Sequence, residues 1–213
     1  MAGDKTVKSR KNAGYSLVEL IVVIAIIVVL MSVLIPGVVG YIKTASRLSA
    51  INTVRVMVTT MEVSMLEHSM EKKVIIDKLY KDRSSNQFID AGYLTNYMLA
   101  RAQRNENYSK SNNDYADFLI AKDILEAVKS GPGEPHPVLK FTKDVRPTGK
   151  TIKTFCNDDS DAAVFVYAPE GGVLYAQVAI KNTWLVTYED SAYSAVEIKS
   201  NTKMVGNEKI KDN

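Results

Sequence analysis

The chain contains, from Lys11 to Ile42, the stretch KNAGYSLVELIVVIAIIVVLMSVLIPGVVGYI. Its part from Leu20 to Ile42 holds 23 residues and no charged side chain. A helix of that length is about 34 Å long, enough to cross a bilayer core of roughly 30 Å. Apolar residues surround this helix on every side instead of forming one stripe, which favours a membrane segment over a buried core helix. We therefore predict a transmembrane helix at residues 15–42.

The 14 residues before this helix, a basic leader, carry the whole basic excess of the chain. Their charged residues are Asp4, Lys5, Lys8, Arg10 and Lys11. Removing these four basic residues from 27, and this one acid from 24, leaves 23 of each. The basic flank predicts a cytoplasmic N-terminus with the C-terminal bulk outside. The neutral remainder argues against a globally basic nucleic-acid surface. No convincing secretory cleavage site follows the apolar run, so we expect the helix to be retained.

The leader ends in a glycine, which is followed by an aromatic residue, the sequence SLVEL and a long apolar run with a proline. This order resembles the N-terminus of type IV pilins and pseudopilins, and the rest of the chain resembles that family in layout. The resemblance implies that a prepilin peptidase removes residues 1–14 by cutting between Gly14 and Tyr15. It also implies methylation of the new Tyr15 amine. Tyr15 stands where phenylalanine is commonest in the family, and Ser16 stands where threonine is commonest.

Glu19 places a carboxylate at the edge of the apolar run. A charge in the middle of a membrane helix costs about 2.5–3.5 kcal/mol on insertion scales, and it costs less at the interface. From the residue alone, Glu19 could simply lie among lipid headgroups. The resemblance implies instead that Glu19 of one subunit pairs with the Tyr15 amine of its neighbour in a filament core, where neither ion is tolerated alone. Such a pair would fix the axial register of the subunits.

Pro36 lies near the end of the apolar run and deprives the Ser32 carbonyl of its helical partner. We expect a kink there, as in the family, and the alternative is a helix end at Ile35. The kink is favoured because an amphipathic pattern continues over residues 43–72 and leads into the head. Its apolar positions, spaced by three and four, are Leu48, Ile51, Val54, Val58, Met61 and Met65. Methionines on this stripe predict adaptable core packing.

Residues 73–213 predict a globular head, with a loop and helix region at 73–137 and an antiparallel sheet at 138–200. In the first region, FIDAGYLTNYMLARAQ indicates a short helix or turn, and NNDYADFLIAKDILEAVKSG indicates a clear helix. In the second, the β-branched and aromatic runs AAVFVYA, GGVLYAQVAI, TWLVTYE and SAVEIKS predict hairpins, with KFTKDV pairing nearby. The tail from Asn201 is expected to fray. The predicted fold class is α+β: a long N-terminal helix packed on a C-terminal antiparallel sheet.

Residues that usually carry chemistry are sparse in this sequence. Cys156 is its one cysteine, and His68 and His136 are its two histidines, with no local pattern that joins them. The sequence has no phosphate-binding glycine loop and no paired-cysteine metal motif. We therefore predict no catalytic residue, no cofactor and no metal, and a protein that is not an enzyme.

In the stretch Asn157–Asp161, the oxygen-bearing residues Asn157, Asp159 and Asp161 stand at alternate positions, as at the start of a calcium loop. Ala162 and Ala168 stand where an EF-hand needs glycine and glutamate, so that specific loop fails. An irregular calcium site remains open, and an Asx turn before a strand is favoured.

These features favour a structural function: a type IV pilin subunit that polymerises into an extracellular filament for adhesion, motility or DNA uptake. A type II secretion or competence pseudopilin is the alternative within the class, and a signal-anchored surface enzyme or binding protein is the alternative outside it. The resemblance implies that its partners are other pilin copies, the prepilin peptidase, and an assembly ATPase with its membrane platform. The precursor would lie in the membrane before assembly. Tyrosines among polar residues leave a nucleic-acid or sugar contact imaginable, but half-buried loop tyrosines are favoured.

Overall fold

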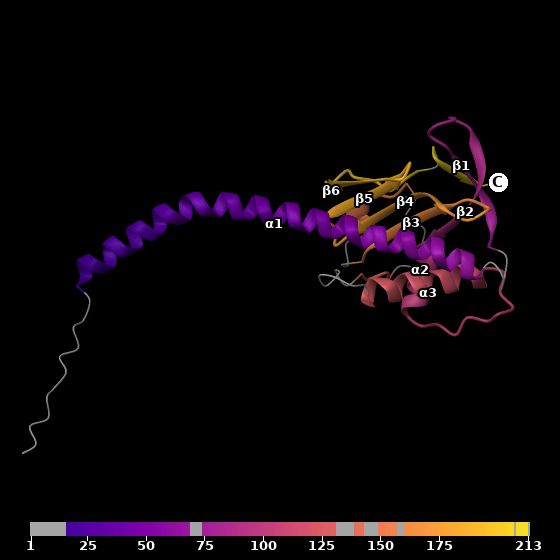
Figure 1. Ribbon diagram of the computed structural model, residues 1–213, viewed down its shortest axis with the longest axis horizontal. Helices are drawn as coiled ribbons and strands as arrows, with labels where there is room; N and C mark the ends of the chain where they lie inside the picture. Colours follow the sequence, from indigo (N-terminus) through magenta and orange to yellow (C-terminus); the bar gives the residue numbers. More distant parts are fainter. Residues whose placement is uncertain are drawn as a thin grey trace, which may run out of the picture. The chain divides into compact units, whose positions relative to one another are not determined.

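The computed structural model describes residues 16–68, 74–130, 139–142, 149–156, 160–206 and 208–212. The chain divides into two compact units, Met1–Ala45 and Ser46–Asn213. Helix α1 (Leu17–His68) is 52 residues long and belongs to both units. Figure 1 follows α1 in indigo and purple, and the strands of the second unit in purple, orange and yellow.

The described part of the first unit is apolar helix. Residues 16–48 are all exposed. Helix α1 is long and apolar enough to cross a membrane, and its most apolar part is not buried by the rest of the described chain. The helix continues through Pro36, and the alternative of a helix end at Ile35 is therefore wrong. The kink at Pro36 stays a prediction.

The outer part of α1, in the second unit, buries one stripe. Its buried apolar positions are Ala50, Val54, Met57, Val58, Met61 and Met65. Steps of three and four place these residues on one face, as the amphipathic pattern predicted. Leu48 is 55% exposed, so its place in the predicted stripe is wrong, because the covered part of the helix begins two residues later, at Ala50. The helix ends at His68, and residues 69–72 of the predicted segment lie outside the described residues.

The second unit contains a seven-stranded sheet with the order β6-β5-β4-β3-β2-β1-β7. Every neighbouring pair is antiparallel. Its strands are β1 (Ile76–Lys81), β2 (Phe88–Thr95), β3 (Ala162–Tyr167), β4 (Val173–Ile180), β5 (Trp184–Glu189), β6 (Ala192–Glu197) and β7 (Ile210–Asp212). Its further helices are α2 (Asn96–Gln103), α3 (Tyr115–Ser130) and α4 (Ile152–Phe155). The predicted α+β class is confirmed, and the four predicted runs form β3 to β6.

Three local predictions differ from the structure. The stretch from Phe88 predicted as a helix or turn is strand β2 up to Thr95, whose hydroxyl then caps α2 by accepting from the Tyr97 amide at 3.4 Å. Strands β1 and β2 therefore extend the sheet into the region expected to hold loops and helices. The C-terminal tail does not fray throughout, because β7 pairs with β1. Met204 and Val205 are buried there as well.

Of KFTKDV, the run at 140–145 expected to pair as a strand, residues 140–142 are described and form no strand, and the rest lies outside the described residues. Most backbone hydrogen bonds of the described segment 139–142 go to side chains instead. Gln103 donates to the Leu139 carbonyl and accepts from the Phe141 amide. Asp161 accepts from the Lys140 amide through its carboxylate, and its own amide donates to the Lys140 carbonyl. These bonds satisfy the backbone of the segment without a neighbouring strand, which local β-propensity could not indicate.

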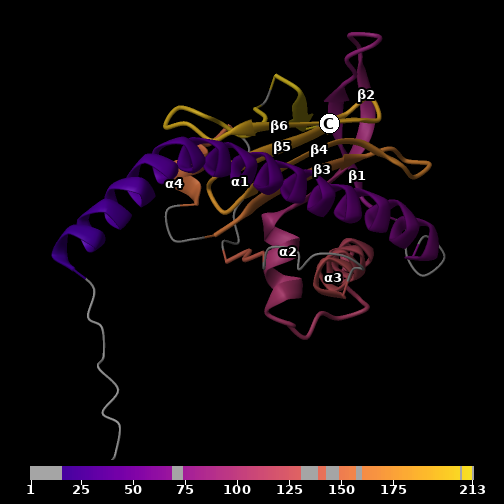
Figure 2. The ribbon, with the colours of Figure 1, turned by 60° about the vertical axis from the view of Figure 1, so that its left-hand side comes forward.

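Both faces of the sheet are covered. On one face α1, α2 and α3 pack on the strands, and Figure 2 shows the three helices beside one another. On the other face lie α4 and the segment around Met204. Strand β3 alternates between the two: Phe165 faces the helical core and Val164 faces the second core. Because both faces are buried, β3 is apolar along its whole length instead of alternating apolar and polar residues.

Gly92 is required by the packing of Tyr167. The two residues are partners across β2 and β3, and the Tyr167 ring is fully buried. A Cβ atom at Gly92 would overlap that ring. The glycine therefore leaves the space in which the Tyr167 ring lies over the strand.

We expect Gly92→Ala to lower the free energy of unfolding of the second unit by about 1–3 kcal/mol, because overpacking forces the Tyr167 ring out of place. Chemical denaturation of the full chain in detergent measures this change. Gly40→Ala is the control, since a Cβ at Gly40 meets nothing within 4 Å. Equal unfolding energies for the Gly92 variant and the wild type would contradict the assignment.

Candidate functional site

The N-terminus of α1 is closed by a reciprocal pair of hydrogen bonds. The Glu19 carboxylate accepts from the Ser16 amide at 2.8 Å, and the Ser16 hydroxyl accepts from the Val18 amide at 3.2 Å. This is the capping box, in which a serine and a glutamate three residues later satisfy amides that the helix leaves unpaired. A negative charge at this end is also favourable to the helix dipole. The spacing Ser-x-x-Glu was visible in the sequence, but its capping role was missed.

The capping box gives Glu19 a local role in addition to the predicted pairing between subunits. In the chain as described, its carboxylate already has an intramolecular partner. A carboxylate has two oxygens and about four lone-pair sites, so the bond from Ser16 leaves capacity for a second donor. Gly14 and Tyr15, the predicted processing residues, lie outside the described residues. The helix begins at Leu17, two residues after Tyr15. The pairing of Glu19 with a Tyr15 amine stays a prediction.

Within the second unit, His68 is joined to a residue far away in sequence. Its Nε2 atom lies 2.9 Å from Asp123 Oδ2, and the Ser64 hydroxyl donates to the same oxygen at 2.6 Å. The aspartate therefore lies between serine and histidine, whereas a catalytic triad places the histidine between the other two. Ser64 is also buried, which does not suit a nucleophile. Cys156 lies in the second core, buried with Ile152 and Phe155.

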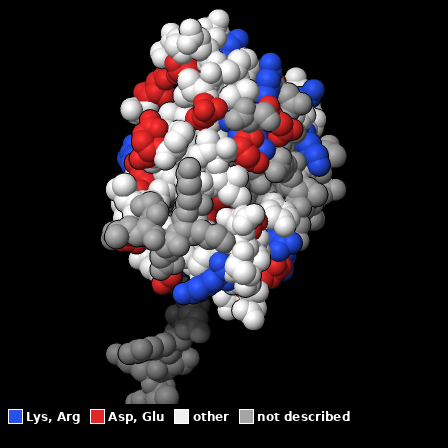
Figure 3. All heavy atoms as spheres, turned by 90° about the vertical axis from the view of Figure 1, so that its right-hand side faces the viewer, with Lys and Arg blue, Asp and Glu red and all other residues white. Residues whose placement is uncertain are grey.

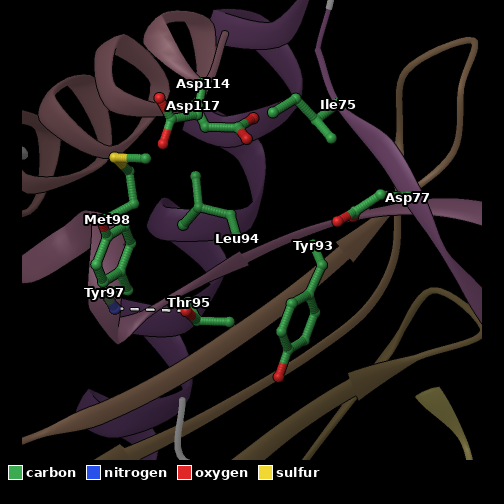
Figure 4. A pocket seen from close by; sticks show the side chains of 9 residues that line it. All are labelled: Ile75, Asp77, Tyr93, Leu94, Thr95, Tyr97, Met98, Asp114 and Asp117. Carbon is green, nitrogen blue, oxygen red and sulfur yellow. Dashed lines mark hydrogen bonds between the residues drawn. The ribbon is translucent and has the colours of Figure 1, made fainter. Parts of the chain in front are cut away.

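The head holds an acidic cavity of about 120 Å³ (Figure 4). Its lining residues are Ile75, Asp77, Tyr93, Leu94, Thr95, Tyr97, Met98, Asp114 and Asp117. This volume is small beside the roughly 300–1,000 Å³ of ordinary ligand pockets. The size fits a few water molecules better than a substrate.

Asp117 is the most perturbed carboxyl of this cavity. Burial raises its pKa to about 7, the hydrogen bond from Tyr167 opposes that rise, and the charges of Asp114 and Asp77 add to it. The Tyr167 hydroxyl donates to Asp117 Oδ1 at 2.8 Å. Burial, followed by the charge of Asp117, also raises the pKa of Tyr167. The pair joins α3 to the centre of the sheet, so its role is structural.

Two of the tyrosines that lie among polar residues, Tyr97 and Tyr108, make aromatic contacts within the molecule. Arg101 lies over the Tyr97 ring at 4.4 Å, and Tyr108 stacks on Phe118 with ring centroids 4.7 Å apart. Neither ring is a free platform for a base or a sugar. On the face drawn in Figure 3, acidic and basic side chains of the described residues are interspersed. This arrangement does not favour a nucleic-acid interface.

Of the stretch weighed as a calcium site, residues 157–159 lie outside the described residues. Asp161 is described and is 2% exposed. Its two carboxylate oxygens accept from the amides of Lys140 and Lys181 at 2.7 and 2.6 Å. Its carbonyl accepts from Asn96 at 3.0 Å. These bonds give Asp161 a role in holding three segments together.

Comparison with known proteins identifies the N-terminal segment. Residues 9–35 match the prokaryotic N-terminal methylation motif, the class III signal peptide of type IV pilins and pseudopilins. The matched residues include Gly14, Tyr15 and Glu19. Searches of curated proteins and of solved structures found no match. The motif supports a pilin-like or pseudopilin precursor.

The raised pKa of Asp117 predicts a pH-dependent stability. Its folded pKa of about 7 lies above the ordinary value of 3.8, so the folded state binds the proton more tightly. The contribution is fully present below about pH 4 and is lost as the pH rises to about 7. At about 1.4 kcal/mol per pKa unit, the loss is at most about 4 kcal/mol.

We expect Asp117→Asn to remove this pH dependence and to be more stable than the wild type above pH 7, because asparagine is neutral and still offers Oδ1 to Tyr167. Denaturation of the full chain between pH 4 and pH 8 measures the effect. Glu170→Gln, at an exposed turn, is the control and should keep the wild-type profile. A wild-type profile in the Asp117 variant would rule out the titration of this carboxyl as the cause.

Proposed function

We propose that this chain is a type IV pilin structural subunit, processed after Gly14 and polymerised through its N-terminal helix into an extracellular filament. The observation that carries the proposal is the continuity of three parts. The methylation motif at residues 9–35 leads into an exposed apolar helix, and that helix continues into the core of an α+β head. A type II secretion or competence pseudopilin is the alternative, since the motif is common to both.

The exposed apolar surface of α1 supports self-assembly. Residues 17–42 leave most of their apolar side chains half exposed or more. Apolar surface contributes roughly 25 cal/mol for each Å² removed from water. A bilayer satisfies this surface before assembly, and only other apolar helices can replace the lipid afterwards. Copies of the same chain supply such helices, so a bundle of α1 segments forms the filament core.

The capping box at Ser16 and Glu19 supports a defined role for the acid in that bundle. Cleavage after Gly14 would create an amine on Tyr15, close to a carboxylate already oriented by the Ser16 amide. An amine and a carboxylate entering an apolar core offset each other's desolvation when they meet at hydrogen-bonding distance. Glu19 of one subunit therefore accepts from the Tyr15 amine of its neighbour, and this pairing sets the axial register.

The proposal includes the partners that the motif implies. A prepilin peptidase cuts the leader and methylates Tyr15, and an assembly ATPase with a membrane platform drives subunits out of the lipid. The single-pass precursor keeps its N-terminus cytoplasmic, and the assembled filament lies outside the cell. The head, residues 73–213, is larger than many pseudopilin heads, which favours a pilus subunit.

The intact mass and N-terminal sequence of filament-borne protein test the processing step. We expect a chain that begins at Tyr15 with a methylated amine. A polymer whose subunits still carry residues 1–14 would overturn the proposal. Filaments on the cell surface would support a pilus, and short filaments confined to the envelope would support the pseudopilin alternative.

We expect Glu19→Gln to be inserted and processed normally but to lower filament yield by roughly tenfold or more, since an unpaired buried amine is strongly destabilising. Glutamine keeps an oxygen for the Ser16 amide, so this variant separates charge pairing from helix capping. Ser16→Ala is the matched control: it removes the bond to the Val18 amide and should leave filament yield near the wild type. Immunoblots of sheared filaments and membranes measure both. Equal losses in the two variants would assign the defect to the cap.

A further inference from the structure

The end of α1 and the middle of α3 bring together three side chains that the processing and assembly segment does not use. A ring nitrogen of His68, a Glu67 carboxylate oxygen and an Asp123 carboxylate oxygen all lie within 4.8 Å of one another. Glu67 and His68 are the last two residues of α1, and Asp123 comes from α3. We propose that these three residues bind one divalent transition-metal ion of the zinc class. This inference does not rest on the proposed function.

The donor set fits that class of ion. One imidazole nitrogen with two carboxylate oxygens suits zinc and its neighbours, whereas calcium takes six to eight oxygen ligands. Zinc lies about 2.0–2.2 Å from such ligands, which places two ligand atoms roughly 3–3.5 Å apart. His68 Nε2 and Asp123 Oδ2 are 2.9 Å apart. A small opening of this pair admits the metal, and the exposed Glu67 side chain can rotate to complete the set.

The charges of the site also match a divalent cation. A neutral imidazole and two carboxylates carry two negative charges together, so binding one divalent ion leaves the site neutral. Three protein ligands leave a fourth tetrahedral position for water. In the absence of metal, the neighbouring carboxylates repel each other across a short distance. A cation removes that repulsion.

A supporting contact already orients one ligand. The buried Ser64 hydroxyl donates to Asp123 Oδ2 at 2.6 Å. Outer hydrogen bonds of this kind hold metal-binding carboxylates in place. The His68 and Asp123 side chains are 17% and 36% exposed, so they are partly shielded while an ion can still enter from solvent.

The bound ion would tie the last turn of α1 to α3. The aspartate and the pair formed by Glu67 and His68 come from segments 55 residues apart, and His68 and Asp123 already make a direct contact. Metal binding to the folded chain alone stabilises it by mass action. At about a hundredfold excess over Kd, the melting temperature should rise by roughly 5–10 °C.

The test uses the untagged full-length protein in detergent, stripped of metal by a chelator and then dialysed. Equilibrium dialysis against micromolar Zn²⁺ should give one zinc per chain, and thermal unfolding should show the rise in melting temperature. Ca²⁺ at the same concentration should do neither. Co²⁺ supplies a spectroscopic readout, because a tetrahedral site gives visible absorption bands that a purely structural hydrogen bond cannot give.

Two variants test proposed ligands, and two others serve as controls. His68→Asn and Asp123→Asn should each lower zinc affinity by at least tenfold and remove the cobalt bands. Glu126→Gln, an exposed acid on the same helix, and His136→Asn, the other histidine of the chain, should bind like the wild type. Dialysis and cobalt spectra are read only where circular dichroism shows a folded variant. No zinc bound by the folded wild type, or binding that survives in the His68 variant, would overturn the proposal.

Discussion

The structure depends on how one helix buries its apolar surface. Between Ala50 and Met65, α1 presents a single stripe, and an antiparallel sheet packs against it. From Leu20 to Ile42 the helix carries no charged side chain, and the described residues of the chain leave it exposed throughout. The same helix therefore meets two requirements. The apolar stripe of its outer part is covered by the rest of the chain, whereas the apolar surface of its inner part requires lipid or other helices to cover it.

The burial of both faces of the sheet explains the composition of its strands. A sheet with α1, α2 and α3 on one face and α4 with the C-terminal segment on the other has two buried faces. Its central strand β3 can then be apolar at every position, and its burial pattern is continuous. The short edge strand β7 is polar at two of its three positions, as expected for a strand with solvent on one side. The C-terminal residues are therefore part of the core and not an appendage.

Buried polar side chains position the segments that have no strand or helix of their own. Asn96 donates to the Asp161 carbonyl and accepts from the Ala163 amide, and Gln103 bonds in the same way to the backbone around residue 140. Each amide side chain therefore makes the two backbone hydrogen bonds that a neighbouring strand would otherwise make. An unpaired polar group in the same place would cost about 1–3 kcal/mol. These bonds explain how the described segment 139–142, which has no strand or helix, is held in the core.

The sequence by itself determined the membrane-length helix, its amphipathic continuation and the hairpins β3 to β6. These features depend on local periodicity and charge, which a window of residues contains. The predicted helix that the structure has as α3, in which Phe118 and Leu125 are buried, has the same origin. The capping box of Ser16 and Glu19 also had a local signal, since its two residues are one helical turn apart.

Tertiary structure decided what depends on distant residues. Strands β1 and β2 contain charged residues and have weak patterns, and β2 is fixed by its pairing with β3, where Gly92 accommodates Tyr167. The burial that raises the pKa of Asp117 and the contact of His68 with Asp123 each join segments about 50 residues apart. No local sequence pattern indicates such a contact between distant residues, because the contact results from the packing of α3 against α1 and the sheet. The physical reason is that periodicity reports which face of an element is apolar, but not which other element will cover it.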